Sequence, residues 1–346
     1  MMSRKEQPRI LNLEPGDFSP EAREILRSVG NLRERPLNRK ELIRRIGDVD
    51  VLITRLGHRI DAEILRAGRN LRAIATATTG LDHIDLACAQ KCGITVLSLK
   101  GETRFLRTIP ASAELTWGLL LALMRRIPFA WADVRAGRWE RDAFLGHDLM
   151  GKRLGIVGVG RIGEKVARYA RAFGMQVAGF DPQRRRFPAG VTRCANLDAL
   201  LRRSDVLSLH VPLAPETTGL IDAGRLNRLP AGAVLINTAR GPVIDESALL
   251  RALQSGALAG AALDVICGET ESGTLRRSPL LRYARTHGNV IVTPHIGGCT
   301  IESRAMTEVF MARKVKRFLD GKRLGAASPS SIRHGGRASR EPSLLR

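Results

Sequence analysis

The chain has 346 residues, of which 44% are hydrophobic, and carries a formal net charge of +22. This length exceeds the roughly 100–200 residues of one domain, and the composition excludes a wholly disordered chain, so two globular domains are expected. The charge would suit a nucleic acid or a membrane surface. However, the Lys and Arg residues are spread along the chain without aromatic interleaving or a basic helical stripe, so nucleic-acid binding is not expected as a main role.

The cysteines and the N-terminal segment bear on the compartment. Five cysteines stand at scattered positions, with no CxxC pair and no histidine spacing typical of zinc. We therefore expect free thiols, no metal site and a cytoplasmic location. The opening segment MMSRKEQPRI has no apolar core, and no run approaches about 18 uninterrupted apolar residues, so neither export nor a membrane span is expected.

The predicted elements begin with an alternation between Val51 and about Val96. Short apolar runs and helix-like segments follow one another as VLITR, DAEILRAG, LRAIATATTG, DLACAQKCG and ITVLSL. That order is typical of βαβ units in a parallel sheet. A longer helical pattern, ASAELTWGLLLALMRRIPFAWADVRAG, follows Pro110 and has the length to bridge two domains.

A second alternation starts at Lys152 and ends with the strand-like run NVIVTPH. Its strict order predicts another doubly wound parallel sheet, and the helical pattern from Glu302 to Leu319 is expected to rejoin the first domain. Beyond Gly321 the chain is rich in Gly, Ser, Pro and Arg without a periodic apolar face. We expect this basic tail, residues 323–346, to be disordered.

A glycine triplet indicates a dinucleotide site. Gly158, Gly160 and Gly163 form GxGxxG between the apolar run LGIV and the helical pattern GEKVARYARAFG, where a tight turn, a close approach to pyrophosphate and helix packing each require glycine. Asp181 ends the next strand, eighteen residues after Gly163, and can accept hydrogen bonds from the adenosine ribose. This favours NAD over NADP, although the arginines at 184–186 could pair with a 2′-phosphate.

Three later strand ends carry candidate catalytic residues, Arg240, Glu269 and His295. The imidazole of His295 can give a proton to a carbonyl oxygen or take one from an alcohol. A carboxylate next to it, that of Glu269, would stabilise the imidazolium, and the forked cation of Arg240 can bind a substrate carboxylate. Taken singly, a strand-end arginine is usually solvated and a lone histidine is usually structural. The residues alone therefore leave the catalytic assignment open.

The segments around these residues resemble signature blocks of the D-isomer-specific 2-hydroxyacid dehydrogenases, including phosphoglycerate dehydrogenase-like members. The blocks are NTARG, the LDV run leading to Glu269, and TPHIGG, and the likeness extends from about Val51 to Leu319 through GLDHIDL, GKRLGIVGVGRIG and HVPLAPETTGLI. The resemblance implies an α/β fold of two doubly wound parallel-sheet domains. A Rossmann cofactor domain (119–297) would be inserted into a flavodoxin-like substrate domain (1–118 and 298–322).

The same resemblance implies an activity and site roles. The enzyme would transfer a hydride between NAD(H) and C2 of a small anionic 2-hydroxy or 2-oxo acid of the D series, with a phosphoglycerate-like acid left open, and would be a homodimer. Arg240 would bind the substrate, and Glu269 would pair with the acid/base His295. The cofactor contacts would include the glycine triplet with Arg161, Ile162, Asp181, Val211, Pro212, Thr238 and Asp264, and the substrate contacts Arg55, Thr79 and Gly80.

Three departures from the family pattern affect the substrate. Thr270 stands where a proline is usual, Leu115 where a histidine is frequent, and SLKGETRFLRTIPASAELTW replaces a shorter turn. Lys100, Arg104 and Arg107 in this variant loop could favour an anionic substrate tail, or could form a solvated basic loop. The alternative function is an NAD-sensing, corepressor-like scaffold with little turnover. The presence of all three catalytic residue types argues against this alternative.

Overall fold

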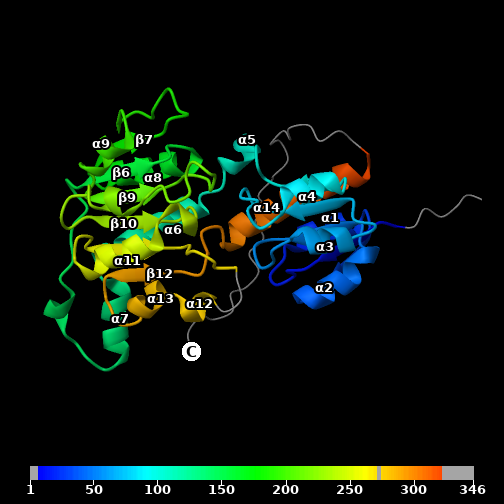
Figure 1. Ribbon diagram of the computed structural model, residues 1–346, viewed down its shortest axis with the longest axis horizontal. Helices are drawn as coiled ribbons and strands as arrows, with labels where there is room; N and C mark the ends of the chain where they lie inside the picture. The colour runs from blue at the N-terminus through cyan, green and yellow to red at the C-terminus, as the bar shows by residue number, and fades with distance from the viewer. Residues whose placement is uncertain (1–6, 271–273, 322–346) are drawn as a thin grey trace, which may run out of the picture.

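The computed structural model describes residues 7–270 and 274–321, which form two α/β domains side by side (Figure 1). The predicted fold class is confirmed: each domain contains one all-parallel sheet with helices packed on it. The tail 323–346, expected to be disordered, lies outside the described residues. None of the helices within 7–270 and 274–321 is long and apolar enough to cross a membrane.

The first domain is built on a five-stranded sheet of order β2-β1-β3-β4-β5. This is the doubly wound order of flavodoxin-like domains. The two central strands read VLIT and AIAT and are buried throughout, as expected for a parallel sheet covered on both faces. The strands are β1 (Arg9–Asn12), β2 (Asn31–Glu34), β3 (Val51–Thr54), β4 (Ala73–Thr76) and β5 (Thr95–Leu97), and the helices are α1 (Pro20–Arg27), α2 (Arg39–Arg45), η1 (Ile46–Asp48), α3 (Ala62–Ala67), α4 (Leu86–Lys91) and α5 (Thr103–Leu106).

The second domain has a seven-stranded sheet of order β12-β11-β10-β9-β6-β7-β8. The order reverses between β9 and β6, the point at which doubly wound sheets bind dinucleotides. The strands are β6 (Arg153–Val157), β7 (Gln176–Phe180), β8 (Val191–Arg193), β9 (Val206–Leu209), β10 (Val234–Asn237), β11 (Gly260–Leu263) and β12 (Val290–Val292). The helices are α8 (Arg161–Ala172), α9 (Leu197–Leu201), α10 (Ala223–Leu226), η3 (Gly241–Val243), α11 (Glu246–Gln254), α12 (Thr274–Arg277) and α13 (Pro279–Ala284).

Two helices connect the domains. α6 (Ala111–Met124) leaves the first domain and packs against α8, β10 and β11 of the second, while α14 (Ile301–Leu319) returns from β12 and packs against α1, β4 and β5 (Figure 1). The second domain is therefore inserted into the first between these helices. The exact boundaries at 118/119 and 297/298 stay a prediction.

The long helix expected after Pro110 is broken in the structure. α6 ends at Met124, and a second helix, α7 (Ile127–Arg135), starts after Arg126, which has a left-handed φ of 54°. Pro128 lies in the first turn of α7, the position where a missing backbone N–H is tolerated. η2 (Arg141–Phe144) follows. Of this predicted long helix, only the α6 part bridges the domains, and α7 turns away.

Most of the shorter helices begin at a side-chain cap. Asn38 caps α2 in a capping box with Glu41, and Asp61, Asp85 and Asp245 accept the backbone N–H three residues ahead at the starts of α3, α4 and α11. Each such cap contributes about 1 kcal/mol. These helices are too short to be stable alone, so capping and packing on the sheet together define where they begin.

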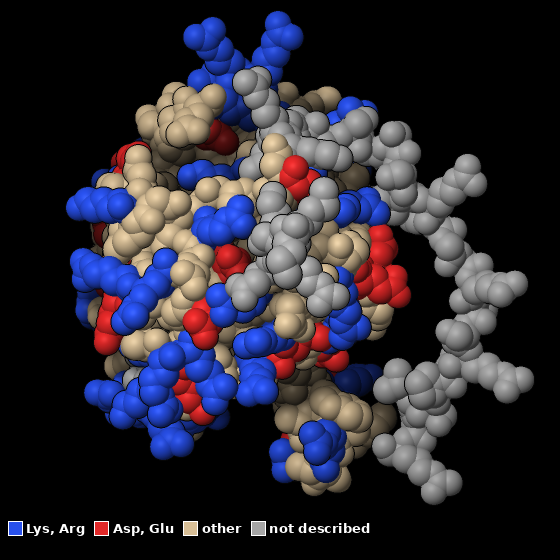
Figure 2. All heavy atoms as spheres, turned by 90° about the vertical axis from the view of Figure 1, so that its right-hand side faces the viewer, with Lys and Arg blue, Asp and Glu red and all other residues tan. Residues whose placement is uncertain are grey.

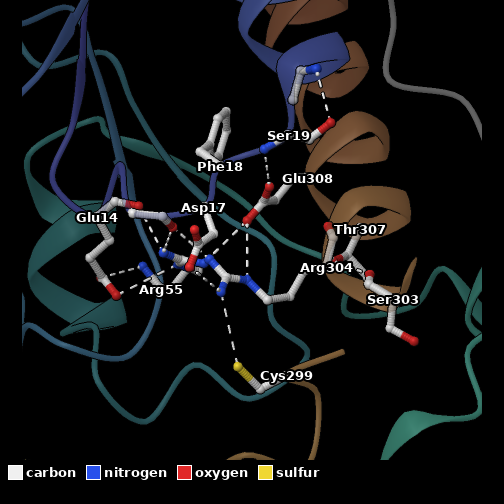
Figure 3. Close-up of polar contacts among 12 residues, drawn as sticks. Glu14, Asp17, Phe18, Ser19, Arg55, Cys299, Ser303, Arg304, Thr307 and Glu308 are labelled. Atoms are coloured by element: carbon white, nitrogen blue, oxygen red, sulfur yellow. Dashed lines mark hydrogen bonds and ion pairs between the residues drawn. The ribbon is translucent and has the colours of Figure 1, made fainter. Parts of the chain in front are cut away.

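A buried polar network ties the two ends of the first domain together (Figure 3). Glu308 of α14 is 2% exposed, accepts the Ser19 N–H at 2.6 Å, and pairs with Arg55 at 3.2 Å and Arg304 at 3.7 Å. Burial raises the pKa of Glu308, although both guanidinium groups favour its charged form. The loop after β1 is held through these contacts to a helix nearly 300 residues later.

We expect Glu308→Ala to lower the free energy of unfolding of this domain by about 3–5 kcal/mol, because two partly buried arginines and an amide lose their shared acceptor. Thermal or urea unfolding measures the loss. Glu302→Ala, an exposed change on the same helix, should cost under about 1 kcal/mol. Equal effects of the two substitutions would contradict the assigned role of Glu308.

Candidate active site

The glycine loop 158–163 joins β6 to α8 at the carboxyl edge of the second sheet. Gly158 has a φ of 88°, and a Cβ atom there would lie 2.6 Å from the His210 carbonyl oxygen. A Cβ at Gly163 would lie 2.4 Å from the carbonyl oxygen of Gly158, whereas one at Gly160 would meet nothing within 4 Å. The outer glycines are thus required by the chain itself, and the open space at Gly160 fits a pyrophosphate approaching the backbone.

Other predicted cofactor residues line the same edge. The Asp181 carboxylate, at the end of β7, accepts the Val159 N–H at 3.0 Å, and Val211 lies against Gly158. The hydroxyls of Thr238 and Thr116 are 2.8 Å apart, which places Thr238 beside α6. Ile162 packs on the core below the loop, and Pro212 accepts the Thr217 hydroxyl through its carbonyl. The structure brings these residues to one sheet edge, and their contacts with a cofactor stay predictions.

Arg161, at the first position of α8, faces the first domain. Its Nη1 donates to the Leu106 carbonyl at 3.4 Å, and burial lowers the pKa of its guanidinium. No acidic side chain pairs with Arg161 in the part of the chain that the structure describes. A cation without a counter-charge at a helix N-terminus suits an anionic group such as pyrophosphate.

His295 and Glu269 form a close pair. Nδ1 of His295 is 2.5 Å from Oε1 of Glu269, and the two side chains are 22% and 24% exposed. The other carboxylate oxygen of Glu269 accepts the Ile266 N–H at 3.3 Å, which orients the acid. Nε2 of His295 makes no hydrogen bond within residues 7–270 and 274–321. The ring is thus oriented by Glu269 and keeps one nitrogen for a reacting oxygen.

Asp264, expected near the nicotinamide, supports the turn that carries His295. Its carboxylate accepts the N–H groups of Ile296 at 2.8 Å and Gly297 at 2.7 Å and the Thr293 hydroxyl at 2.6 Å. The residue is 1% exposed, and burial raises the pKa of its carboxyl group. His295 itself has a left-handed φ of 54°, so the turn needs this support. The contact of Asp264 with a nicotinamide carboxamide stays a prediction.

Arg240, after β10, reaches across to the first domain. Its Nε donates to Asp82 Oδ1 at 3.1 Å, and its Nη1 donates to the Ala239 carbonyl at 2.8 Å. Burial alone would raise the pKa of Asp82, but the Arg240 cation and hydrogen bonds hold that pKa below its ordinary value. A Cβ at Gly80 would lie 1.7 Å from Arg240 Nη2, so Gly80 is required for this approach. The predicted loop at Thr79 and Gly80 therefore adjoins the predicted substrate arginine.

Asp82 and His83 are site residues that the sequence analysis missed. His83 is 4% exposed, and neither ring nitrogen has a hydrogen-bond partner among the described residues. Burial is the main cause that lowers its pKa, the Asp82 and Glu14 carboxylates oppose it, and the Arg240 and His295 charges lower the pKa further. Both missed residues stand in GLDHIDL, and an acid two positions after Gly80 was a usable signal for an arginine partner.

Arg55 is engaged in the network of the first domain (Figure 3). Its Nη2 donates to the carbonyls of Glu14 at 2.8 Å and Gly16 at 3.2 Å, and its Nη1 donates to Glu308 at 3.2 Å. No hydrogen bond or ion pair joins it to Arg240 or His295 among the described residues. A contact between Arg55 and a substrate phosphate stays a prediction.

The variant loop 98–110 is anchored on α14. Lys314 Nζ donates to the Ser98 carbonyl at 2.8 Å and to Glu102 at 2.7 Å, and the rings of Phe105 and Phe310 stack with centroids 4.1 Å apart. The loop carries α5, which lies at the junction of the domains (Figure 1). Its other basic residues, Lys100, Arg104 and Arg107, are exposed.

A glycine loop at the switch point of a doubly wound sheet, with an arginine and a histidine–carboxylate pair at neighbouring strand ends, defines a dinucleotide-dependent oxidoreductase site. Comparison with known proteins specifies the class. Residues 117–297 match the family model described as D-isomer specific 2-hydroxyacid dehydrogenase, NAD binding domain. The chain belongs to this family of NAD-dependent oxidoreductases, which confirms the predicted family, cofactor and enzyme class.

Named relatives cover most of the chain. A hydroxypyruvate reductase of Thermotoga maritima is 39% identical over 279 residues, 81% of this chain and 88% of the relative. A glyoxylate reductase of Thermofilum pendens is 41% identical over 293 residues, 83% of each chain. A D-3-phosphoglycerate dehydrogenase of Methanocaldococcus jannaschii is 37% identical over 305 residues, and this chain spans only 56% of its length.

Solved structures agree with the fold. The crystal structure of D-lactate dehydrogenase from Aquifex aeolicus, complexed with NAD and lactic acid, superposes with a TM-score of 0.78 at 30% identity. The match covers 90% of this chain and 95% of that one. A protein from Thermus thermophilus superposes with a TM-score of 0.79 at 35% identity, covering 91% and 97% of the two chains.

His210, whose carbonyl adjoins Gly158, gives a prediction about pH. The Nδ1 atom of the ring is buried, Nε2 lies 2.8 Å from the Ser208 hydroxyl, and burial lowers the pKa of the imidazole to about 3. Between pH 6.5 and about pH 3 the unfolded chain binds a proton that the native chain does not, so the free energy of unfolding should fall by about 1.4 kcal/mol per pH unit on acidification. His210→Gln should flatten this slope in urea unfolding between pH 6.5 and 4.5.

His287→Gln, at an exposed histidine, is the matched control and should keep the wild-type slope. An identical pH dependence in the wild type and in His210→Gln would show that the buried ring is not held neutral.

Proposed function

We propose that this enzyme reversibly transfers a hydride between NAD(H) and C2 of a small 2-oxo or 2-hydroxy acid of the D series. The observation that carries the proposal is the pairing of His295 with Glu269 at 2.5 Å, and the contact of Arg240 with Asp82 of the other domain at 3.1 Å supports it. An acid/base group and a substrate cation are thus available from neighbouring strand ends. The family membership supplies the D stereochemistry.

Each residue then has a defined task. NADH, when bound, supplies the hydride that adds to C2. Arg240, oriented through Asp82, places its outer N–H groups beside Gly80, where they can hold the acid's carboxylate and its carbonyl oxygen. His295 gives a proton from Nε2 to that oxygen as the hydride arrives, which yields the alcohol, and the reverse step returns the proton to the ring. Glu269 stabilises the imidazolium form.

The substrates we propose first are hydroxypyruvate and glyoxylate. The relatives that match this chain over most of their own length are named for these acids, whereas the phosphoglycerate dehydrogenase is nearly twice as long as the matched region. Arg55, the residue expected to meet a phosphate, is already bonded to Glu308 and to two carbonyls. The alternative of a scaffold with little turnover has no observation in its favour.

Substitution of the acid/base pair tests the mechanism. We expect His295→Ala to lower kcat for reduction by about 10²–10⁴-fold, because no other group at the ring position donates the proton. Glu269→Gln should lower kcat by less than His295→Ala does, because the imidazole is retained but loses its carboxylate partner at 2.5 Å. NADH oxidation with glyoxylate, hydroxypyruvate and phosphohydroxypyruvate, followed by absorbance, measures both effects.

Wild-type turnover that survives in His295→Ala would contradict the proton-transfer role. Tight NADH binding without turnover of any acid in the panel would instead favour the scaffold alternative. His287→Gln serves as the matched histidine control, because that residue is exposed and lies outside the site.

The enzyme is proposed to be a homodimer formed through the arm 127–150. This segment projects from the second domain (Figure 1). Six of its large apolar side chains are exposed by 41–83%, and such a concentration usually marks a protein interface. They are Ile127, Trp131, Val134, Trp139, Leu145 and Met150.

We expect the wild type to sediment at twice the chain mass and the double variant Trp131→Glu, Trp139→Glu to sediment as a monomer, because the charges cannot be buried in an apolar interface. Analytical ultracentrifugation measures both. Leu86→Glu, an apolar-to-acid change at a residue 43% exposed on α4, should leave the dimer intact. A monomeric wild type would contradict the proposed interface.

A cytoplasmic location without a nucleic-acid partner is also proposed. All five cysteines are free thiols, which supports a reducing compartment. On the face drawn in Figure 2, Lys and Arg side chains alternate with acidic and uncharged ones and form no continuous stripe. Such a surface can attract small anions without offering a track for a phosphate backbone.

A further inference from the structure

The segment after β7 holds an arginine in an unusual place for an NAD site. Asp181 accepts the Val159 N–H at 3.0 Å and the Gln183 N–H at 3.0 Å, so its carboxylate faces the glycine loop where the adenosine ribose binds. Three consecutive arginines, at 184–186, follow directly. Arginines in this position of a doubly wound domain are the groups that accommodate the 2′-phosphate of NADP.

The first of these arginines is already bound within the chain. Arg184 donates from Nη1 to the Val159 carbonyl, from Nη2 to Glu164 Oε1, and from Nε to the Arg186 carbonyl at 2.6 Å. Glu164 lies in the first turn of α8, directly after the glycine loop. α8 packs beside β7 (Figure 1). The ion pair between Glu164 of α8 and Arg184 after β7 is therefore next to the expected ribose position.

The pair is accessible to a ligand and electrically balanced. The side chains of Arg184 and Glu164 are 29% and 26% exposed, so a bound nucleotide could reach either one. Arg185 and Arg186 are exposed and make no ion pair within the described residues. A phosphate at the ribose would therefore meet two carboxylates, those of Asp181 and Glu164, and would have to compete with Glu164 for Arg184.

We propose that Glu164 is a specificity-determining residue that keeps this site selective for the dinucleotide without a 2′-phosphate. It does so by holding Arg184 against the glycine loop. Selectivity for NAD(H) then depends on two acids: Asp181, which binds the ribose hydroxyls, and Glu164, which neutralises the Arg184 guanidinium held at the glycine loop. The inference concerns the cofactor alone and does not depend on which acid is the substrate.

The test is a double-mutant cycle on nucleotide binding. Dissociation constants of NADH and NADPH are measured by nucleotide fluorescence, at one fixed salt concentration, for the wild type, Glu164→Gln, Arg184→Gln and the double variant. Binding is read without any 2-oxo acid, so a failure of the proposed catalysis would not affect the result. Glu24→Gln, which removes one exposed acid on α1 of the other domain, controls for the change in net charge.

We expect the wild type to bind NADH at least about tenfold more tightly than NADPH. Glu164→Gln should tighten NADPH binding by about five- to tenfold, which is within the net contribution of one ordinary hydrogen bond, and should change NADH binding by less than about twofold. When Arg184 is already replaced by Gln, adding Glu164→Gln should tighten NADPH binding by less than about twofold. Arg184→Gln alone, which leaves Glu164 unpaired, should weaken NADPH binding by about threefold or more.

Three results would overturn the proposal. The first is equal affinity of the wild type for NADH and NADPH. The second is a dissociation constant for NADPH that does not change in Glu164→Gln. The third is a gain in NADPH affinity from Glu164→Gln that is as large in the Arg184→Gln background as in the wild type. In the last case Glu164 would act by repulsion alone. Circular dichroism and thermal unfolding verify that each variant folds. If Glu164→Gln does not fold, the NADPH affinity of Arg184→Gln still tests the proposal.

Discussion

The buried carboxylate of Asp264 fixes the turn on which the proposed chemistry depends. Its three hydrogen bonds, at 2.6–2.8 Å, hold the backbone on both sides of His295. A left-handed residue other than glycine costs on the order of 1–3 kcal/mol, whereas hydrogen bonds to a charged group contribute about 1.5–3 kcal/mol each. The hydrogen bonds to the carboxylate therefore contribute more than the left-handed conformation of His295 costs. The backbone of this turn thus holds the imidazole in position to contact Glu269.

The second domain contributes this histidine, and the first domain contributes the loop it works beside. The Arg240–Asp82 contact joins residues 158 positions apart and brings the two strand edges together at one place. Gly80 allows the contact, because any side chain there would overlap the guanidinium. The Glu308 network in turn fixes the loops after β1 and β3 to α14, the helix that begins six residues after His295. Site geometry thus depends on both interdomain connections.

The features that were predictable from sequence are those with local causes. The glycine triplet could be read because a positive φ and close backbone packing each leave few alternatives, and the sheets could be read because buried parallel strands are continuous apolar runs. Arg240, Glu269 and His295 could be assigned only through the family resemblance, since each is unremarkable alone. The cofactor, by contrast, could be predicted from the glycine triplet and Asp181.

Other features have distant or conformational causes. The break at Arg126 was missed, although Pro128 was a visible signal that one helix would not continue. The partner of Arg55 stands 253 residues away, and the Asp82–Arg240 pair also links segments that no local pattern relates. The retained arginine at 184 was noted as a possible phosphate ligand, but its capture by Glu164 depends on how β7 packs beside α8. Such pairings require the three-dimensional structure.

The most direct test of the central claim follows the transferred atoms. The enzyme would be incubated with NADH that carries deuterium at both C4 positions and with hydroxypyruvate or another prochiral 2-oxo acid that it reduces. Mass spectrometry and chiral chromatography of the product then locate the label and the configuration. The account predicts deuterium at C2 of a D-hydroxy acid. An L-hydroxy acid, or a product without deuterium at C2, would contradict it.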